Sequence, residues 1–346
     1  MDTFTVPCAR CAEFRARFEA EGFVVLGCDA DPARPGMCVL KFERPTTVRA
    51  TAANPASATA QATTASAVTA AAGPTAPAVA DALRRHVNVT ALNLRATPSA
   101  TSSANILATL SLGQPVTLLG DQQSGWWPVR LADGSEQGFV KGLIDDADGI
   151  GTPSLRLPAA PAQEALVAAA VEQWARFRFG QGKETVDPFF RYVGEMWAAL
   201  HLPHDGREDI PWSAAAMSFI VRQAAASHVG YQSFKFAASH STYIHDAIVK
   251  AGQAGAPFHG VRLFEARPQL GDLVARSREG AITFEQAAAS DAFKSHTDVV
   301  IAVHADAVLA IGGNVSDSVS VTRYPKTASG HLDDAHGVFA LLVNKA

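Results

Sequence analysis

Three polar residues in the C-terminal half of the chain have the types and order that nucleophilic hydrolysis requires. Ser213 follows a polar loop and opens the apolar stretch 213–220, for which we predict a helix. A helix N-terminus offers free N–H groups and the positive end of a dipole, which stabilise a developing anion. His296 begins a strand-like apolar run, and Asn314 ends the next one. Ser213 is therefore the candidate nucleophile, His296 the candidate base and Asn314 the candidate orienting residue.

The same residues also have purely structural interpretations. A serine at a helix opening is most often an N-cap, and a single histidine at a strand end is more often structural than catalytic. Only the ordered set of three favours chemistry. Asp298 lies two residues after His296, on the same strand face, and is the alternative orienting residue.

A second hydroxyl–imidazole pair, His240 and Ser241, precedes a helix that we predict over 242–251. Helix capping by Ser241 explains this pair equally well. Together with Trp212 and Tyr243, the pair supplies the candidate substrate contacts around the nucleophile.

The surrounding elements predict an α+β domain over residues 162–346. Apolar residues recur at helical spacing over 163–177 and 187–200, and apolar strand-like runs follow at 296–303 and 307–311. Helices thus come first, and the strands that would carry the base and the orienting residue come last. The histidines are scattered and no HExxH motif is present, so we expect neither a metal nor another cofactor.

Residues 87–147 predict a small all-β module. Period-2 apolar alternation is interrupted by a turn signal about every 8–12 residues, which is typical of a small barrel. Trp126 and Trp127 are adjacent in one predicted strand, so their side chains point to opposite faces and one should lie outside the core. That tryptophan would be a candidate ligand contact, whereas a module that acts only as a spacer would use both for packing.

Residues 1–46 predict a small α/β cap, which holds all four cysteines of the chain: Cys8, Cys11, Cys28 and Cys38. The first two have the spacing of half a zinc ribbon, but the other two lack it, so the metal signal is weak. We favour buried thiols or a disulfide near the strand ends.

Two connecting segments separate these parts. Residues 51–80 contain no charged residue, and 14 of the 30 positions are Ala, so this stretch has no apolar face to bury. We therefore predict a flexible linker over 47–86 and a Pro-rich hinge over 148–161.

The overall composition excludes several classes of partner. The chain has 346 residues and a formal net charge of −4, without the basic excess of a nucleic-acid binder. No apolar run reaches the roughly 18 residues of a membrane span. The N-terminal residues lack a basic region followed by an apolar one, so we expect no signal peptide and synthesis in the cytoplasm.

The β-module resembles the bacterial SH3-like domain. The residues that carry the resemblance are Leu-Asn-Leu-Arg at 92–95, Pro98-Ser99, Gly113-Gln114-Pro115-Val116, Gly125-Trp126 and Gly138-Phe139-Val140. The resemblance implies that this module binds cell-wall peptides or glycans.

The C-terminal segment resembles two groups of bacterial domains. Gly-Asp-Leu-Val at 271–274, His-x-x-Val-Val from His296 and Gly-Gly-Asn at 312–314 resemble the NlpC/P60 and CHAP peptidoglycan amidases and endopeptidases. The stretches 211–215, 240–244 and 313–319 resemble, more closely, a bacterial domain of unknown function, number 2272. The first resemblance implies a papain-like fold.

That resemblance also implies that Ser213 is the nucleophile, His296 the base and Asn314 the orienting residue. The related hydrolases use cysteine at the position of Ser213, and no cysteine follows Cys38 here. A hydroxyl has a far higher pKa than a thiol and needs concerted proton removal. Ser213 is therefore a serine nucleophile, an inactive position or an engineered replacement.

We accordingly expect a peptidoglycan-targeting hydrolase, of amidase or endopeptidase type, with an SH3-like wall-binding module. The alternatives are a catalytically inactive wall-binding or adaptor protein, and a serine esterase that acts on acylated glycans. The expected partners are peptidoglycan or its stem peptides. If the chain is an antibacterial effector or a phage-type lysin, we also expect a secretion-system component or an immunity protein as a partner. Non-classical delivery would then bring the chain to the periplasm or the cell wall.

Overall fold

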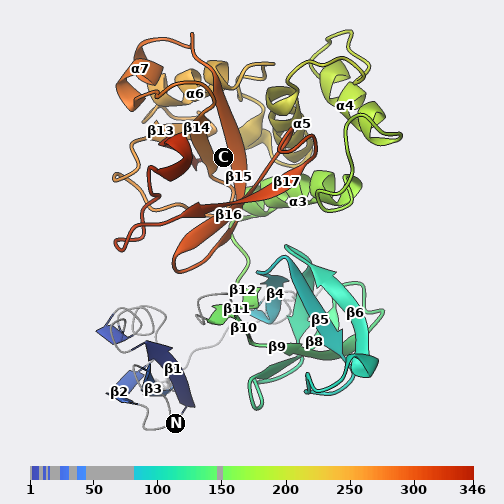
Figure 1. The fold of residues 1–346 in the computed structure, drawn as a ribbon, viewed down its shortest axis with the longest axis vertical. Helices are drawn as coiled ribbons and strands as arrows, with labels where there is room; N and C mark the ends of the chain where they lie inside the picture. Colours follow the sequence, from blue (N-terminus) through green and yellow to red (C-terminus); the bar gives the residue numbers. More distant parts are fainter. Residues whose placement is uncertain are drawn as a thin grey trace, which may run out of the picture. The chain divides into compact units, whose positions relative to one another are not determined.

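The computed structural model describes residues 2–7, 11–12, 15, 24–30, 37–43, 82–145 and 151–346. The chain divides into two compact units, Met1–Thr75 and Ala76–Ala346, which are described separately (Figure 1).

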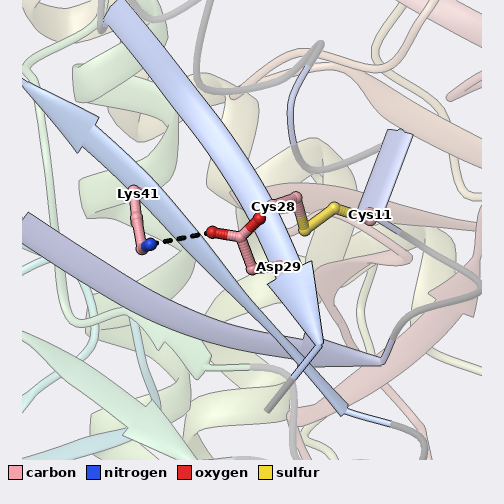
Figure 2. Close-up of a disulfide and its surroundings, with 4 residues drawn as sticks. All are labelled: Cys11, Cys28, Asp29 and Lys41. Carbon is pink, nitrogen blue, oxygen red and sulfur yellow. Dashed lines mark hydrogen bonds and ion pairs between the residues drawn. A yellow bond between two sulfur atoms is a disulfide. The ribbon is translucent and has the colours of Figure 1, made fainter.

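The first unit contains a three-stranded antiparallel sheet in the order β1-β3-β2. Its strands are β1 (Asp2–Pro7), β2 (Val24–Ala30) and β3 (Met37–Glu43). Lys41 of β3 donates a hydrogen bond of 2.8 Å to the carboxylate of Asp29 on β2 (Figure 2).

A disulfide joins Cys11 to Cys28 of β2 (Figure 2). Cys38 is disulfide-bonded as well, and Cys8 lies outside the described residues. The disulfide interpretation is thus confirmed for the Cys11–Cys28 pair, whose sulfurs are no longer available as zinc ligands. A covalent link that closes a loop of this length stabilises the fold by about 3 kcal/mol.

The β-module of the second unit is a seven-stranded sheet in the order β12-β4-β7-β8-β9-β5-β6. Its strands are β4 (Arg84–Val87), β5 (Ala91–Arg95), β6 (Ile106–Ser111), β7 (Pro115–Leu118), β8 (Trp126–Leu131), β9 (Gln137–Lys141) and β12 (Leu155–Arg156). A separate pair is formed by β10 (Leu143–Asp145) and β11 (Gly151–Pro153). Alternating apolar residues of these strands, such as Leu92, Leu94 and Val116, fill one buried core.

This module differs from the sequence prediction in extent and closure. β4 begins at Arg84, inside the predicted linker, and β12 lies inside the predicted hinge. Strands of four and two residues are too short to show period-2 alternation, so the sequence pattern missed them. Because β12 and β6 end the order of described strands, the sheet is open rather than a closed barrel.

The C-terminal domain combines helices with a six-stranded antiparallel sheet in the order β13-β18-β14-β15-β16-β17. The strands are β13 (Phe258–Val261), β14 (Leu273–Ser277), β15 (Ser295–Val303), β16 (Ala307–Gly312), β17 (Ser320–Pro325) and β18 (Val338–Asn344). The helices are α3 (Pro161–Arg176), α4 (Phe189–Ala198), α5 (Ser213–Ser227), α6 (His240–Val249) and α7 (Phe284–Ala289). The expected mixed α+β class is confirmed, with the helices mostly preceding the strands.

Strand β15 separates two buried layers. On one face Val299 and Ile301 pack with the apolar residues of α3, α5 and α6. On the other face Val300 packs with Val274 and Tyr324 in a second cluster. Alternate residues of β15 therefore serve different cores, which decides where each polar residue at its start can point.

Several chain segments meet where β15 begins. Because β14 and β16 run antiparallel to β15, both end at the edge of the sheet at which β15 starts. Helices α5 and α6 contact β15 from the same layer (Figure 1). This edge collects the polar residues of the candidate site.

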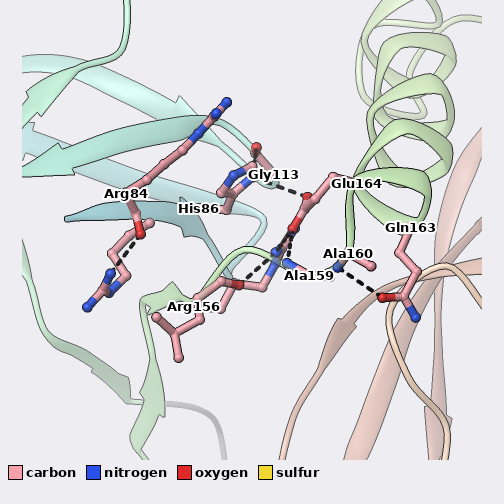
Figure 3. A network of polar contacts seen from close by, with 10 residues as sticks. Arg84, His86, Gly113, Arg156, Ala159, Ala160, Gln163 and Glu164 are labelled. Atoms are coloured by element: carbon pink, nitrogen blue, oxygen red, sulfur yellow. Dashed lines mark hydrogen bonds and ion pairs between the residues drawn. The ribbon is translucent and has the colours of Figure 1, made fainter. Parts of the chain in front are cut away.

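Glu164 of α3 connects the β-module to the C-terminal helices (Figure 3). Its carboxylate accepts hydrogen bonds of 2.5 and 3.0 Å from Arg156 and one of 2.6 Å from the Ala159 N–H. His86 of β4 lies 3.3 Å from the same carboxylate. Burial alone would raise the pKa of Glu164, but the hydrogen bonds from Arg156 and Ala159 outweigh burial and lower it.

Within the described residues, no helix is both long and apolar enough to cross a membrane.

We predict that Glu164→Gln lowers the free energy of unfolding at pH 7 by about 1.5–3 kcal/mol, because it removes hydrogen bonds to a charged, half-buried group. The Glu164 contribution is complete above the pKa of the unfolded chain, about 4.3, and is lost as the pH falls through the lowered folded-state pKa. Urea unfolding at pH 7 and at stepwise lower pH measures both effects. The exposed Glu172→Gln on the same helix is the control, expected to change stability by less than about 0.5 kcal/mol. Equal effects of the two variants would contradict the prediction.

Candidate active site

Ser213 and His240 form a direct hydroxyl–imidazole pair. Each is the first residue of its helix, Ser213 of α5 and His240 of α6. Ser213 Oγ lies 2.7 Å from His240 Nε2. Ser213 is 2% exposed and His240 5%, so the pair is shielded from bulk water.

The other ring nitrogen of His240 contacts two hydroxyl groups. Nδ1 lies 2.9 Å from Thr297 Oγ1 and also contacts the hydroxyl of Tyr243. The two hydroxyls lie 3.1 Å apart. Among the described residues no carboxylate is hydrogen-bonded to the ring, and the partners that orient His240 are the hydroxyls of Ser213, Thr297 and Tyr243.

The surroundings keep His240 uncharged. Burial lowers its pKa well below 6.5, and the charges of His296, Arg278 and Arg276 lower it further. Burial likewise raises the pKa of Tyr243, so its hydroxyl keeps its proton. A neutral imidazole retains one nitrogen that can accept a proton from Ser213.

A second buried network begins at His296. Its Nε2 lies 2.7 Å from Asp298 Oδ1, and the hydroxyl of Tyr324 donates to the other carboxylate oxygen. Arg276 Nε donates in turn to the Tyr324 hydroxyl, at 3.1 Å. Burial alone would raise the pKa of Asp298, but the charge and hydrogen bond of His296 lower it. An ionised carboxylate only accepts, so His296 carries a proton on Nε2.

The two networks lie close together without sharing a hydrogen bond. The ring centroids of His240 and His296 are 5.0 Å apart. Within the described part of the chain, no hydrogen bond joins Ser213 to His296. The geometry therefore pairs Ser213 with His240, which the sequence analysis coupled with Ser241 as a substrate contact, and not with His296, the predicted base. It pairs His296 with Asp298, the alternative orienting residue.

Asn314 does not orient either histidine in this structure. It follows β16 in the left-handed region, with φ 54°, and Ser316 and Asp317 adopt the same conformation. No described hydrogen bond joins its side chain to His240 or His296. The sequence analysis placed Asn314 at the end of a strand, whereas β16 ends at Gly312 and Asn314 lies in the loop that follows.

Trp212 is a buried neighbour of the site and not a surface contact. It is 1% exposed, stacks on Phe177 with ring centroids 5.6 Å apart, and donates from Nε1 to the carboxylate of Glu184. Glu184, with Phe190 and others, also lines a cavity of about 310 Å³. Glu184 could not be predicted from the sequence, because no local pattern links it to a tryptophan 28 residues away.

Of the other candidate contacts, Ser241 and Tyr243 are buried in α6. Ser241 Oγ lies 2.8 Å from Ser239 Oγ, at the helix start. In the β-module, Trp127 packs against the core cluster, whereas Trp126 is half-buried and does not join it. The expectation that only one of the two tryptophans joins the core agrees with this placement.

Close packing at the end of β16 requires glycine. A Cβ at Gly312 would lie 1.6 Å from Asp298 Oδ1 and 2.8 Å from His296 Nε2. A Cβ at Gly313 would lie 2.3 Å from that of Ala216 and 2.9 Å from the Trp212 ring. The two glycines therefore let the strand pass directly between the second network and the start of α5.

No metal centre is formed by the described residues, among which no three His, Cys, Asp or Glu side chains could hold an ion together. The chemistry that the described arrangement supports is proton transfer between a hydroxyl and a neutral imidazole at a helix N-terminus.

Comparison with known families accounts for both parts of the second unit. Residues 90–145 match the bacterial SH3 domain. Residues 177–341 match a family described as an uncharacterized protein conserved in bacteria (DUF2272). The chain contains a bacterial SH3 domain followed by a DUF2272 domain. Both resemblances identified from the sequence are thereby confirmed, and the Ser213–His240 pair lies within the DUF2272 domain.

Among solved structures, NlpC2 from Trichomonas vaginalis is 10% identical, with a TM-score of 0.25, and the match covers 75% of this chain and 73% of that one. NlpC1 from the same organism is 9% identical, with a TM-score of 0.23 and coverage of 72% and 67%. Likenesses of this size fix neither the fold nor a function. No curated protein shows significant similarity to the chain.

We predict that Gly312→Ala in the DUF2272 domain lowers the free energy of unfolding by about 1–3 kcal/mol or more, because the added methyl overlaps the Asp298 carboxylate. The His296 imidazole should lose its hydrogen bond, which shifts its ¹⁵N resonances. Thermal unfolding and NMR measure the two effects. Gly120→Ala is the control, since its Cβ would meet only Pro128 at 3.8 Å. An unchanged His296 spectrum in Gly312→Ala would contradict the described packing.

Proposed function

We propose that the protein is a peptidoglycan-directed hydrolase in which Ser213 attacks an amide carbonyl of a stem peptide. The observation that carries the proposal is the 2.7 Å contact between Ser213 Oγ and His240 Nε2 at the start of α5. The Ser213 hydroxyl is hydrogen-bonded to a neutral imidazole, and the residue lies at a helix N-terminus. This is the arrangement of an activated nucleophile.

His240 is the general base in this mechanism, in place of His296. With its proton on Nδ1, the ring donates to Thr297 Oγ1 and accepts the Ser213 proton on Nε2. Ser213 Oγ then bonds to the carbonyl carbon, and the imidazolium returns the proton to the leaving amine as the C–N bond breaks. Water, deprotonated by the same nitrogen, hydrolyses the acyl ester and restores the Ser213 hydroxyl.

The start of α5 supplies donors for the oxyanion. The first hydrogen bond of the helix runs from the Ala216 N–H to the Trp212 carbonyl, so the N–H groups of residues 213–215 have no partner within the helix. These groups and the helix dipole would stabilise the negative charge of the tetrahedral intermediate. In other enzymes, loss of one such donor costs about 10²–10³ in rate.

His296 and Asp298 have a supporting role in this proposal. Their pair lies beside the His240 ring, and Gly312 packs against it. The His296–Asp298 pair would hold the edge of the sheet in place and set the electrostatic potential at His240. Removing His296 should therefore slow the reaction less than removing His240.

The proposal that the substrate belongs to the cell wall rests on the bacterial SH3 domain. The resemblance of this domain to wall-binding modules implies peptide or glycan binding, and half-buried Trp126 outside its core is the candidate contact. The disulfide of the first unit supports action in an oxidising compartment such as the periplasm. We retain peptidoglycan stem peptides as the proposed partner on these grounds.

The central test is digestion of isolated peptidoglycan by the full chain, with soluble products identified by mass spectrometry. We predict that Ser213→Ala and His240→Ala each reduce fragment release by at least about 10³-fold, and that the double variant is no slower than either single one, because the two residues act as a unit. Ser227→Ala, the same substitution at the exposed end of α5, should leave the rate unchanged.

Three outcomes would contradict the proposal that this chain is a hydrolase with Ser213 as its nucleophile. Binding to peptidoglycan without fragment release by the unaltered chain would favour the inactive wall-binding protein. Release that survives Ser213→Ala would require another nucleophile. Activity gained only in Ser213→Cys would identify an inactive position, because a thiol needs less assistance in losing its proton than a hydroxyl.

The hydrolysis rate should stay near its maximum as the pH falls through 6.5, the ordinary pKa of histidine. Burial lowers the pKa of His240 well below this value, so the base stays unprotonated where an exposed histidine would be charged. A pH profile of kcat/KM between pH 4 and 8 measures the acid limb. An acid limb at or above 6.5 would exclude His240 as the base.

A further inference from the structure

Tyr243 is a buried titratable side chain to which the proposed mechanism gives no role. It lies in α6, three residues after His240. Side chains at this spacing share one face of a helix and lean toward its N-terminus, so the Tyr243 ring extends back beside His240. The two rings meet edge to face with their centroids 5.6 Å apart, and the Tyr243 hydroxyl contacts His240 Nδ1. The other ring nitrogen, Nε2, is the one that contacts Ser213.

Thr297 reaches the same nitrogen from the sheet. Its Oγ1 lies 2.9 Å from His240 Nδ1 and 3.1 Å from the Tyr243 hydroxyl. Nδ1 and the two hydroxyl oxygens therefore form a closed triangle, to which α6 contributes one hydroxyl and β15 the other. Neither hydroxyl is hydrogen-bonded to any further group of the described chain, so their partners are His240 and each other.

Aromatic packing holds the Tyr243 ring in place. The side chain is 1% exposed, and its ring lies against that of Phe234, with centroids 5.0 Å apart. The Phe234 ring packs in turn against Phe258. A phenylalanine at position 243 would make the same aromatic contacts, so the fold does not need the hydroxyl there. Because a buried hydroxyl costs free energy unless it is hydrogen-bonded, its contact with His240 Nδ1 is what explains it.

A hydroxyl suits a nitrogen whose protonation changes during a reaction. It donates to an unprotonated ring nitrogen and accepts from a protonated one. Once His240 has taken the Ser213 proton, both ring nitrogens are protonated, so Tyr243 and Thr297 can only accept from Nδ1. Their two oxygens then lie next to the positive charge, and among the described residues no carboxylate is hydrogen-bonded to the ring. In a Ser–His–Asp triad a carboxylate has this task.

We infer that Tyr243 is a positioning residue of the hydrolase, whose hydroxyl holds the His240 ring and, with Thr297, stabilises the imidazolium that forms as Ser213 attacks. The inference rests on the proposed function and adds a residue to it. No proton leaves Tyr243 in this role, because burial raises the pKa of its hydroxyl well above the ordinary value of 10. Tyr243 instead accepts a hydrogen bond that strengthens as charge develops on the ring, which lowers the barrier.

The test is Tyr243→Phe in the full chain, assayed on a soluble stem peptide so that kcat and KM are measured separately. We expect kcat to fall about ten- to hundredfold, as for the loss of a hydrogen bond to a charged group. KM should be unchanged, because Tyr243 is buried and acts through His240 rather than on the substrate. Thr297→Val should lower kcat as well, and Thr297→Ser, which keeps a hydroxyl, should retain most of it.

Tyr192→Phe is the matched control, since this half-buried tyrosine of α4 packs against Phe177 and Phe189. It should leave kcat unchanged. ¹⁵N NMR of the histidine-labelled resting protein adds a readout that does not depend on turnover. Tyr243→Phe should shift the His240 Nδ1 resonance, whereas Tyr192→Phe should not.

An unchanged kcat in Tyr243→Phe, a loss confined to KM, or an unshifted Nδ1 resonance would overturn the inference. Failure of Tyr243→Phe to fold would overturn it too, because the hydroxyl would then be needed for the fold itself. Cleavage at equal rates by the unaltered chain and Tyr243→Phe would leave the hydrolase proposal standing. No cleavage by the unaltered chain, with the Nδ1 shift observed, would contradict the hydrolase proposal and leave the contact between Tyr243 and His240 standing.

Discussion

The hydrogen bond between Ser213 and His240 is the interaction on which the rest of the site depends. Both residues are first residues of helices, so the bond exists only because α5 and α6 both begin at the edge where β15 starts. The apolar layer of α3, α5 and α6 against Val299 and Ile301 holds the two helix starts at this distance. Packing of the helical layer thus determines whether a hydroxyl meets an imidazole.

Two buried histidines in one small region have opposite electrostatic environments. His240 has only neutral partners, and burial keeps it uncharged. His296 faces an ionised carboxylate that Tyr324 also binds. A buried charge is stable only with such partners, since desolvation of an unpaired ion costs several kcal/mol. This difference leaves His240 with an unprotonated nitrogen for proton transfer. It also holds His296 in a fixed position beside His240.

The sequence predicted the elements of the site better than its contacts. The helix at Ser213 and the strand at His296 follow from apolar periodicity. The partner of Ser213 could not be predicted, because alternation along β15 shows that Thr297 and His296 face opposite sides without showing which side faces the helices. Thr297 faces them and contacts His240, whereas His296 faces Asp298. Asparagine adopts the left-handed conformation more readily than most non-glycine residues, but its presence alone does not show that Asn314 adopts it.

The most direct test of the account is the protonation state of His240 in the resting protein. Selective ¹⁵N labelling of histidine, with His240→Gln for assignment, distinguishes the two neutral tautomers by NMR. The account predicts that His240 carries its proton on Nδ1, keeps Nε2 unprotonated at pH 7, and stays neutral as the pH falls through 6.5. A proton on Nε2, or an imidazolium at pH 7, would contradict it, because His240 could then not accept the proton of Ser213.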